Sequence, residues 1–212
     1  MKLYSYWQST TSYRVRAVLN LKGVEYDILP VNILTGEQRG VGYRGMNPGM
    51  GVPTLVLDDG QVLTQSLAII DYLDATWSDP PMLPGDASRR ARVLAAALAI
   101  AVDVHPVNNL RVVQALKTRF GADQDACVEW MHHWMAEGFD QFAALIEDEA
   151  RFSFNDDAPD LADICLVAQA YNARRWGLAL EDWPRLAAIE AACLALPEIE
   201  AAHPRRQPDA VA

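Results

Sequence analysis

Hydroxyl side chains gather in the segment Ser9-Thr10-Thr11-Ser12, where a short strand is expected to give way to a helix. Residues 2–7 are apolar and aromatic, as in a strand, and apolar residues recur at helical spacing from Arg14 onward. A helix N-terminus offers backbone N–H groups and the positive end of the helix dipole, and the hydroxyls add O–H donors. Such a turn could hold a thiolate or a carboxylate. In the alternative interpretation, Ser12 or Thr11 merely caps the helix.

Two further segments could complete a ligand site in the same region. Val52-Pro53 opens an expected strand, and a cis proline at this place in a thioredoxin-like domain presents the preceding backbone to a ligand peptide. Gln65-Ser66 precedes the next helix, where Ser66 and the helix end offer donors and partial positive charge to a carboxylate. Each feature alone is more often structural. Together, in this order, they indicate a site for a thiol-containing tripeptide.

The elements that must position these residues fall into two parts. Over residues 1–84, short strands alternate with helical patterns in the order βαβ and then ββα, which a small thioredoxin-like α/β domain requires. Beyond a linker rich in proline, residues 85–212 are rich in Ala and Leu at helical period, so an all-α second domain is predicted. Its helices are expected over residues 88–119, 123–149, 161–176 and 184–196. The tail from His203 is expected to be a surface extension.

Composition argues against several other classes of protein. The formal net charge is −10 and no basic cluster could follow a phosphate backbone, so nucleic acid is not an expected partner. The longest apolar run, residues 93–102, is too short to cross a bilayer, and residues 1–8 do not resemble a secretory signal. A cytoplasmic protein without a membrane partner is expected. The three cysteines are widely spaced and lack Cys–His metal spacing, so neither a disulfide framework nor a metal site is predicted.

The same segments resemble the zeta class of glutathione transferases, specifically the maleylacetoacetate and maleylpyruvate isomerases. The turn S-x-x-S-x-R-V-R and the segment HPVNN carry the most specific part of the likeness. The similar stretches are KLYSYWQSTTSYRVRAVLNLKGVEY (2–26), NPGMGVPTL (47–55), TQSLAIIDYLD (64–74), DVHPVNNLRV (103–112) and LADICLVAQAYNARRWGL (161–178). The resemblance implies a thioredoxin-like domain, an all-α domain, a homodimer and glutathione as cofactor.

The resemblance also implies roles for individual residues in the first domain. Ser9 would activate the glutathione sulfur, and Thr10 and Thr11 would complete the helix-end site. The family often has cysteine at the position of Thr11, and threonine keeps a donor there. The backbone of Val52, held by Pro53, would pair with the cysteinyl part of glutathione. The residues implied to hold its γ-glutamyl carboxylate are Gln65 and Ser66.

Residues of the second domain would line the substrate cleft. His105 and Asn109 would face the cofactor, while Arg111 and Arg175 would meet the substrate carboxylates. In the alternative interpretation, His105 is a core histidine at a helix kink and Arg174-Arg175 is a solvated helix end. Neighbouring residues on a helix diverge, so only one of these two arginines can face the cleft, and the resemblance selects Arg175.

Gln8 departs from the family, which commonly has arginine at this position. A neutral amide does not reproduce a bidentate guanidinium–carboxylate contact. If that arginine helps to bind a dianionic substrate, this protein would bind such a substrate more weakly or prefer another one. Gln8 is therefore included among the expected substrate-binding residues.

Three functions remain open on the sequence. The first is glutathione-dependent cis–trans isomerisation of a small dicarboxylic enediketo acid, maleylacetoacetate or maleylpyruvate, by reversible addition of thiolate to the cis double bond. The second is transfer of glutathione to α-halo acids with loss of halide, which Gln8 makes more plausible. The third is a transferase-like binding protein without catalysis. Retention of the three segments around Ser9, Val52 and Gln65 argues against the third.

Overall fold

The computed structural model describes residues 1–211, which form two compact units. One unit contains residues 1–82 together with the C-terminal residues from Leu194, and the other contains residues 83–193. The first is an α/β unit and the second is helical, as predicted. The expected division into 1–84 and 85–212 differs from this arrangement at the C-terminus, whose residues cluster with the first unit. No helix in the described part of the chain is long and apolar enough to cross a membrane.

The first unit is built on a four-stranded mixed sheet. Its elements are β1 (Lys2–Ser5), α1 (Thr10–Leu21), β2 (Asp27–Pro30), η1 (Glu37–Arg39), α2 (Val41–Met46), β3 (Thr54–Val56), β4 (Val62–Thr64), α3 (Ser66–Thr76), α9 (Pro197–Ala202) and η3 (Pro204–Arg206). The strand order is β2-β1-β3-β4, with β1 parallel to β2 and the other pairs antiparallel. The predicted strands are therefore present, and β1 ends at Ser5, two residues before the end of the segment 2–7.

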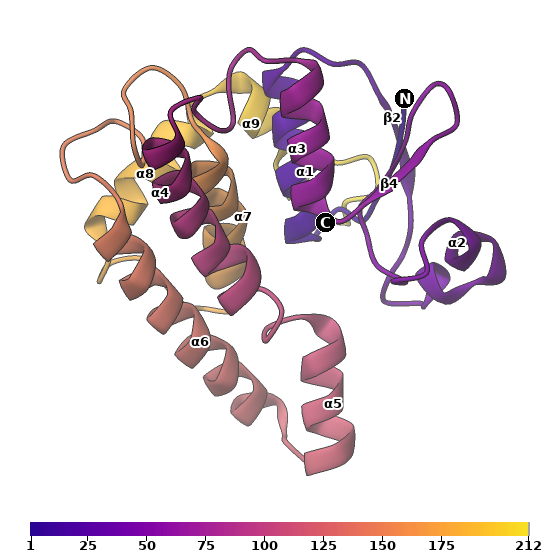
Figure 1. Cartoon of the computed structure of the whole chain (residues 1–212). Helices are drawn as coiled ribbons and strands as arrows, with labels where there is room; N and C mark the ends of the chain where they lie inside the picture. The colour runs from indigo at the N-terminus through magenta and orange to yellow at the C-terminus, as the bar shows by residue number, and fades with distance from the viewer. Residues whose placement is uncertain (212) are drawn as a thin grey trace. The chain divides into compact units, whose positions relative to one another are not determined.

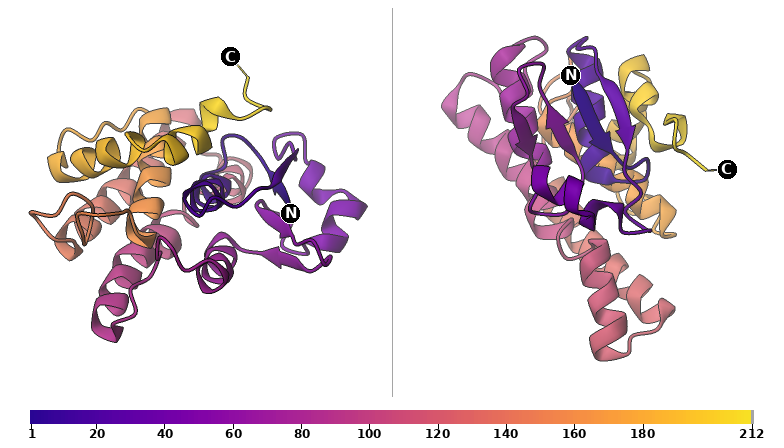
Figure 2. Two further views of the ribbon diagram at one scale, coloured as in Figure 1. Left: turned by 90° about the horizontal axis from the view of Figure 1, so that it is seen from above. Right: turned by 90° about the vertical axis from the view of Figure 1, so that its right-hand side faces the viewer.

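Helices α1 and α3 pack side by side against the sheet, and α2 lies on its other side (Figures 1 and 2). Their contact faces are apolar, and burying them stabilises both helices and sheet. The fully buried side chains of this core include Leu3, Val15, Val18, Leu55, Ile69 and Leu73. The short helix α2 and the turn η1 were not predicted, because their residues show no helical periodicity of apolar side chains.

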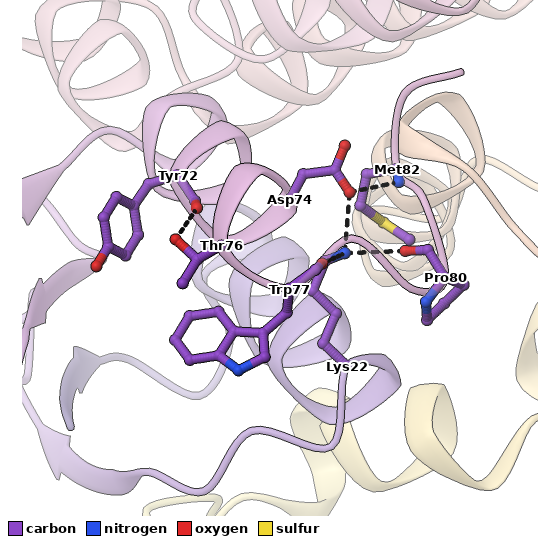
Figure 3. A network of polar contacts seen from close by, with 7 residues as sticks. All are labelled: Lys22, Tyr72, Asp74, Thr76, Trp77, Pro80 and Met82. Carbon is purple, nitrogen blue, oxygen red and sulfur yellow. Dashed lines mark hydrogen bonds and ion pairs between the residues drawn. The ribbon is translucent and has the colours of Figure 1, made fainter. Parts of the chain in front are cut away.

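A buried lysine ties the end of α1 to the end of α3 (Figure 3). The Lys22 ammonium donates to the Asp74 carboxylate at 2.9 Å and to the carbonyl oxygens of Trp77 and Pro80 at 2.5 and 2.9 Å. The same Asp74 oxygen accepts the N–H of Met82 at 2.8 Å. Because an ammonium group has three protons, these three acceptors use all of them. The network fixes the path of the chain after α3.

The C-terminal segment is packed onto the first unit, so the prediction of a surface extension is wrong. Helix α9 packs against α1, and Pro204 and Gln207 are buried. The buried Arg16 guanidinium donates from Nε to the carbonyl of Ala202 at 3.0 Å, and the ring of His203 meets that of Tyr13 edge to face. These contacts join residues far apart in the sequence, so no local sequence pattern predicts them.

The second unit contains helices around one central helix. They are α4 (Ala87–Leu98), the π-helical segment η2 (Ala99–Val104), α5 (Leu110–Phe120), α6 (Gln124–Leu145), α7 (Leu161–Arg175) and α8 (Pro184–Leu194). Helix α7 is buried on all sides over most of its length, and α4 packs against it and against α6. The N-terminus of α7 is closed by a capping box between Asp160 and Asp163.

The helix predicted over 88–119 is interrupted by η2 and by a turn over residues 105–109. Pro106 has no N–H to donate to a helical ladder, and Asn109 caps the new helix α5 through a side-chain bond to the N–H of Arg111. Gly138 of α6 lies so close to η2 that an added Cβ would stand 2.0 Å from a methyl carbon of Val104. This close approach fixes the segment immediately before His105.

Candidate active site

The register of the sheet brings the three predicted segments to one edge. Tyr4 of β1 pairs with Thr54, and Thr54 pairs with Thr64 of β4. Because these pairs are antiparallel, the end of β1, the start of β3 and the end of β4 lie at the same edge. The loops leaving this edge carry Ser9, Val52-Pro53 and Gln65-Ser66.

Ser9 is the N-cap of α1, so neither Ser12 nor Thr11 has the capping role considered from the sequence. Ser9 is extended, with φ −69° and ψ 118°, and its Oγ accepts the N–H of Ser12 at 3.2 Å. The backbone carbonyl of Ser9 accepts the first helical bond, from Tyr13 at 2.8 Å. The capping hydroxyl therefore stands at the positive end of a 12-residue helix, where negative charge is stabilised.

The hydroxyls of Ser9 and Thr11 form a chain to the loop before the proline. Thr11 Oγ1 donates to the carbonyl oxygen of Val52 at 2.8 Å, and Ser9 Oγ lies 2.9 Å from Thr11 Oγ1. A threonine hydroxyl has a single proton, so Ser9 is the donor in the second contact. This proton is free to turn toward another acceptor placed beside Ser9. The Val52–Pro53 peptide bond is cis, as predicted.

Helix α3 begins without a side-chain cap at Gln65. Gln65 has φ 69° and ψ 118°, a left-handed conformation that is uncommon outside glycine and is concentrated at ligand sites. Its carbonyl accepts the N–H of Ile69 at 2.9 Å, and Ser66, the first helical residue, is buried. An uncapped helix start next to a buried hydroxyl suits a carboxylate ligand.

Two residues that sequence reasoning missed hold the loop in front of Val52. The Tyr43 hydroxyl donates to the carbonyl of Gly51 at 2.6 Å and contacts Thr54 Oγ1 at 2.9 Å. Asn47 Nδ2 donates to the same carbonyl at 2.8 Å and to Thr54 Oγ1 at 3.0 Å. Burial raises the pKa of Tyr43, so its hydroxyl stays a neutral donor. The Asn-Pro-Gly sequence at 47–49 signals a turn, but not the long-range role of its asparagine.

Gln8 lies immediately before Ser9 in the turn after β1 and is half-buried. The neighbouring Thr10, the first residue of α1, is buried. The loops at one edge of the sheet, with the starts of α1 and α3, therefore carry all the residues predicted for the first domain: Gln8, Ser9, Thr10, Thr11, Val52, Pro53, Gln65 and Ser66.

The remaining predicted residues belong to the second unit. His105 ends the π-helical segment, with its N–H bonded to the carbonyl of Ile100 at 2.9 Å, and its side chain is half-buried. Asn109 caps α5, and Arg111 in the first turn of that helix is exposed. The turn between them is held by α6, since Trp130 Nε1 donates to the carbonyl of Val107 at 3.0 Å.

The two arginines at the end of α7 have different surroundings. Arg174 makes a bidentate contact with the buried carboxylate of Glu190, with nitrogen–oxygen distances of 2.6 to 3.2 Å. Arg175 is exposed and its guanidinium lies 5.0 Å from the centre of the Trp176 ring. The Arg174 guanidinium is thus committed to Glu190, whereas Arg175 keeps donors available for a ligand.

These donors match the chemistry of glutathione. The Ser9 hydroxyl and the start of α1 suit a thiolate, the backbone beside the cis proline suits a peptide, and the uncapped start of α3 suits a carboxylate. Within the described residues, no group of three or more His, Cys, Asp or Glu side chains is arranged to hold a metal ion.

Comparisons with known proteins agree with this assignment. Residues 8–76 match the family model described as glutathione S-transferase, N-terminal domain. The chain is 42% identical over 211 residues to a maleylacetoacetate isomerase of Pseudomonas aeruginosa, covering 99% of this chain and 98% of that protein. It is 43% identical over 213 residues to a maleylpyruvate isomerase of a Ralstonia species, covering 99% of both.

Two solved structures extend the likeness to the whole fold. The holo structure of a maleylpyruvate isomerase, described as a bacterial glutathione S-transferase of the zeta class, has a TM-score of 0.96 at 42% identity and covers all of both chains. A maleylacetoacetate isomerase of Methylobacterium extorquens with bound malonate and glutathione has a TM-score of 0.95 at 33% identity, again over all of both chains. The chain therefore belongs to the glutathione S-transferase family, in the zeta class that contains the maleylacetoacetate and maleylpyruvate isomerases.

Proposed function

We propose that this protein is a glutathione-dependent cis–trans isomerase of maleylacetoacetate. The observation that carries the proposal is the hydroxyl chain from Ser9 through Thr11 to the Val52 carbonyl, at the sheet edge that also bears the uncapped start of α3. The thiol, the cysteinyl backbone and the γ-glutamyl carboxylate of glutathione each have a matching group there. A binding scaffold without catalysis has no need of a hydroxyl aimed at a thiol.

Each group of the chain has a definite task in this reaction. When bound, glutathione supplies a thiolate that adds to the substrate double bond and leaves again, which permits rotation about that bond. Ser9 turns its proton from Thr11 to the sulfur, which with the α1 dipole favours the anion and lowers the thiol pKa. The resemblance to the zeta class assigns Arg111 and Arg175 to the substrate carboxylates, and His105 and Asn109 to the cofactor.

Maleylpyruvate is the alternative substrate. The identities to relatives named for the two activities, 42% and 43%, do not separate them. Both are dicarboxylates, and malonate, bound in the Methylobacterium extorquens structure, is also one. Gln8, next to Ser9, affects the choice between the two acids. The family commonly has arginine at this position, and its guanidinium could neutralise a second carboxylate, which the amide of Gln8 cannot do.

The decisive experiment measures isomerisation of both freshly generated acids with trace glutathione. Turnover that far exceeds the glutathione supplied establishes the isomerase, and the faster substrate identifies the preferred acid. Consumption of one glutathione per halide released from an α-halo acid, without isomerisation, would establish the transferase instead. Glutathione binding with neither reaction would contradict both.

We propose further that the protein is a homodimer and acts in the cytoplasm. Both statements rest on the resemblance to the zeta class. Light scattering coupled to size-exclusion chromatography tests the first, since one chain has a mass of 23.4 kDa. Fractionation of the source cells with an antibody tests the second.

A further inference from the structure

The C-terminal segment touches the loop that leads to Ser9. An oxygen of the Asp209 carboxylate accepts the backbone N–H of Trp7 at 3.0 Å. Asp209 stands in a turn closed by a bond from the N–H of Ala210 to the carbonyl of Gln207 at 3.0 Å. Gln207 is buried, and its amide nitrogen donates to the carbonyls of Ala201 and His203, both at 3.0 Å. The carboxylate is thus held in place by α9 and the residues that follow it.

A second contact holds the carbonyl of the same residue. Arg16 of α1 is completely buried, and its Nη2 donates to the carbonyl of Trp7 at 3.2 Å. Its Nη1 donates to Ser5 Oγ at 2.9 Å, and its Nε donates to the carbonyl of Ala202 at 3.0 Å. Both polar groups of the Trp7 backbone are therefore held, one directly by Asp209 and the other by an arginine that α9 helps to orient.

Trp7 lies two residues before Ser9, the proposed donor to the glutathione thiol. The loop between them is tight, since the N–H of Ser9 donates to the carbonyl of Tyr6 at 3.0 Å. The strength of a hydrogen bond from Ser9 to sulfur depends on distance and angle, so movement of this loop weakens it. We propose that Asp209 is a positioning residue, which acts through the Trp7 N–H to keep Ser9 in the place where it stabilises a thiolate.

The inference rests on the proposed function, and its first readout does not require that function. Asp209→Ala removes the acceptor of the Trp7 N–H, whereas Asp209→Asn keeps an oxygen of the same shape. Asp59→Ala is the matched control, because Asp59 also accepts a backbone N–H, from Gln61 at 2.9 Å, in a turn at the other end of β4 from Gln65. Amide hydrogen exchange at Trp7, followed by NMR in the protein without glutathione, reports the contact itself.

Two further measurements connect the contact to the site. The pKa of the glutathione thiol in the binary complex is read from thiolate absorbance, and kcat and KM are measured for isomerisation. For Asp209→Ala we expect faster exchange at Trp7, a higher pKa of the bound thiol and a loss in kcat/KM of about tenfold, the scale of one hydrogen bond to a charged group. In Asp209→Asn, the exchange rate at Trp7, the pKa of the bound thiol and kcat/KM should all stay close to their wild-type values. Asp59→Ala should match the wild type in all three.

The outcomes separate the inference from the proposed function. A wild-type exchange rate at Trp7 and an unchanged thiol pKa in Asp209→Ala would overturn the inference. A loss of kcat/KM in Asp209→Asn as large as that in Asp209→Ala would also overturn it. A lower melting temperature without a change in thiol pKa would also overturn it, because it would assign Asp209 to folding alone. If the wild type binds glutathione but isomerises neither acid, the proposed function fails while exchange and thiol pKa still decide the role of Asp209.

Discussion

The two ends of helix α1 carry polar networks of opposite construction. At the C-terminal end, the Lys22 ammonium is completely buried, and its three protons go to Asp74 and to two carbonyls (Figure 3). At the N-terminal end, Ser9 and Thr11 carry half-buried neutral hydroxyls. Ser9 donates its proton to Thr11, and Thr11 donates its own to the Val52 carbonyl.

The difference separates a network that stabilises the fold from one that can bind. A buried ion pair whose hydrogen bonds are all made has no donor left for a ligand, so its effect is confined to the fold. The Ser9 hydroxyl can instead exchange Thr11 for a better acceptor without breaking the cap, because the cap uses its lone pair. Changes at the two ends should therefore affect different measurements.

The largest effect is expected from Lys22→Met. This change removes the cation beside Asp74 and two carbonyls, and breaking a buried pair costs about 3–5 kcal/mol of stability. The free energy of unfolding, measured in urea, should fall by this amount, while kcat per folded molecule stays at the wild-type value. The double variant Lys22→Met with Asp74→Asn should recover part of the loss. A loss below about 1 kcal/mol would place this pair with ordinary surface contacts.

The reverse pattern is expected from Ser9→Ala. Loss of a donor to the reacting anion should lower kcat/KM by about 10²–10³-fold, with a rise in the pKa of the bound thiol. Stability should fall by only about 1 kcal/mol, the usual effect of losing an N-cap. Asp86→Ala is the matched control, because Asp86 caps α4 through the N–H of Arg89 at 2.8 Å. If Asp86→Ala lowers activity as much as Ser9→Ala does, Ser9 acts only as a cap.

The residues of the N-terminal network could be named from the sequence, whereas the hydrogen bonds that join Ser9, Thr11 and Val52 could not. Hydroxyls at a strand–helix junction, proline at a strand start and serine at a helix start are local patterns, and the strand register then brought them together. The alternative interpretation placed the cap at Ser12 or Thr11 and not at Ser9, because serine and threonine are all suitable caps by residue type. Only the backbone angles of Ser9 distinguish it.

The contacts that buttress the site were not predictable in this way. The segment after His203 has two prolines and few apolar residues, which favours an exposed tail. The Asp209 carboxylate of this segment and the Ala202 carbonyl just before it bind Trp7 and Arg16, which lie almost the whole chain away. Tyr43 and Asn47 likewise act on carbonyls through side chains. Backbone acceptors have no sequence signature, so such networks emerge only with the fold.

A third buried network, in the second unit, pairs two carboxyl groups and so differs from both ends of α1. Asp163 accepts the N–H groups of Ser153 and Asp160, each at 2.8 Å, while Asp160 caps α7 through the N–H of Ala162. Burial, with the Asp163 carboxylate beside it, raises the pKa of Asp160 to about 8. The folded state therefore holds a proton that the unfolded state releases near pH 4, so this group's contribution to stability falls between about pH 4 and 8.

Asp160→Asn should reduce this dependence, since an amide oxygen still caps and the amide nitrogen can donate to Asp163. The free energy of unfolding of the wild type should decline from pH 5 to pH 8, by at most about 1.4 kcal/mol per pH unit for one proton, and the variant should show a smaller slope. Asp123→Asn, at the exposed cap of α6, should keep the wild-type slope. Equal slopes in wild type and Asp160→Asn would show that Asp160 does not hold the proton.

The smallest effect is expected from Thr11→Val, which keeps the shape of the side chain and removes the hydroxyl between Ser9 and Val52. The Val52 carbonyl loses one donor and Ser9 loses its resting acceptor, a change of about 0.5–1.5 kcal/mol, or up to about tenfold in kcat/KM. Because Ser9 keeps its own proton, the bound thiol should stay closer to its wild-type pKa than in Ser9→Ala. Thr11→Ser restores the hydroxyl and should restore activity. A loss in Thr11→Val as large as that in Ser9→Ala would move the principal thiol donor from Ser9 to Thr11, and the N-terminal network would then work through its second hydroxyl.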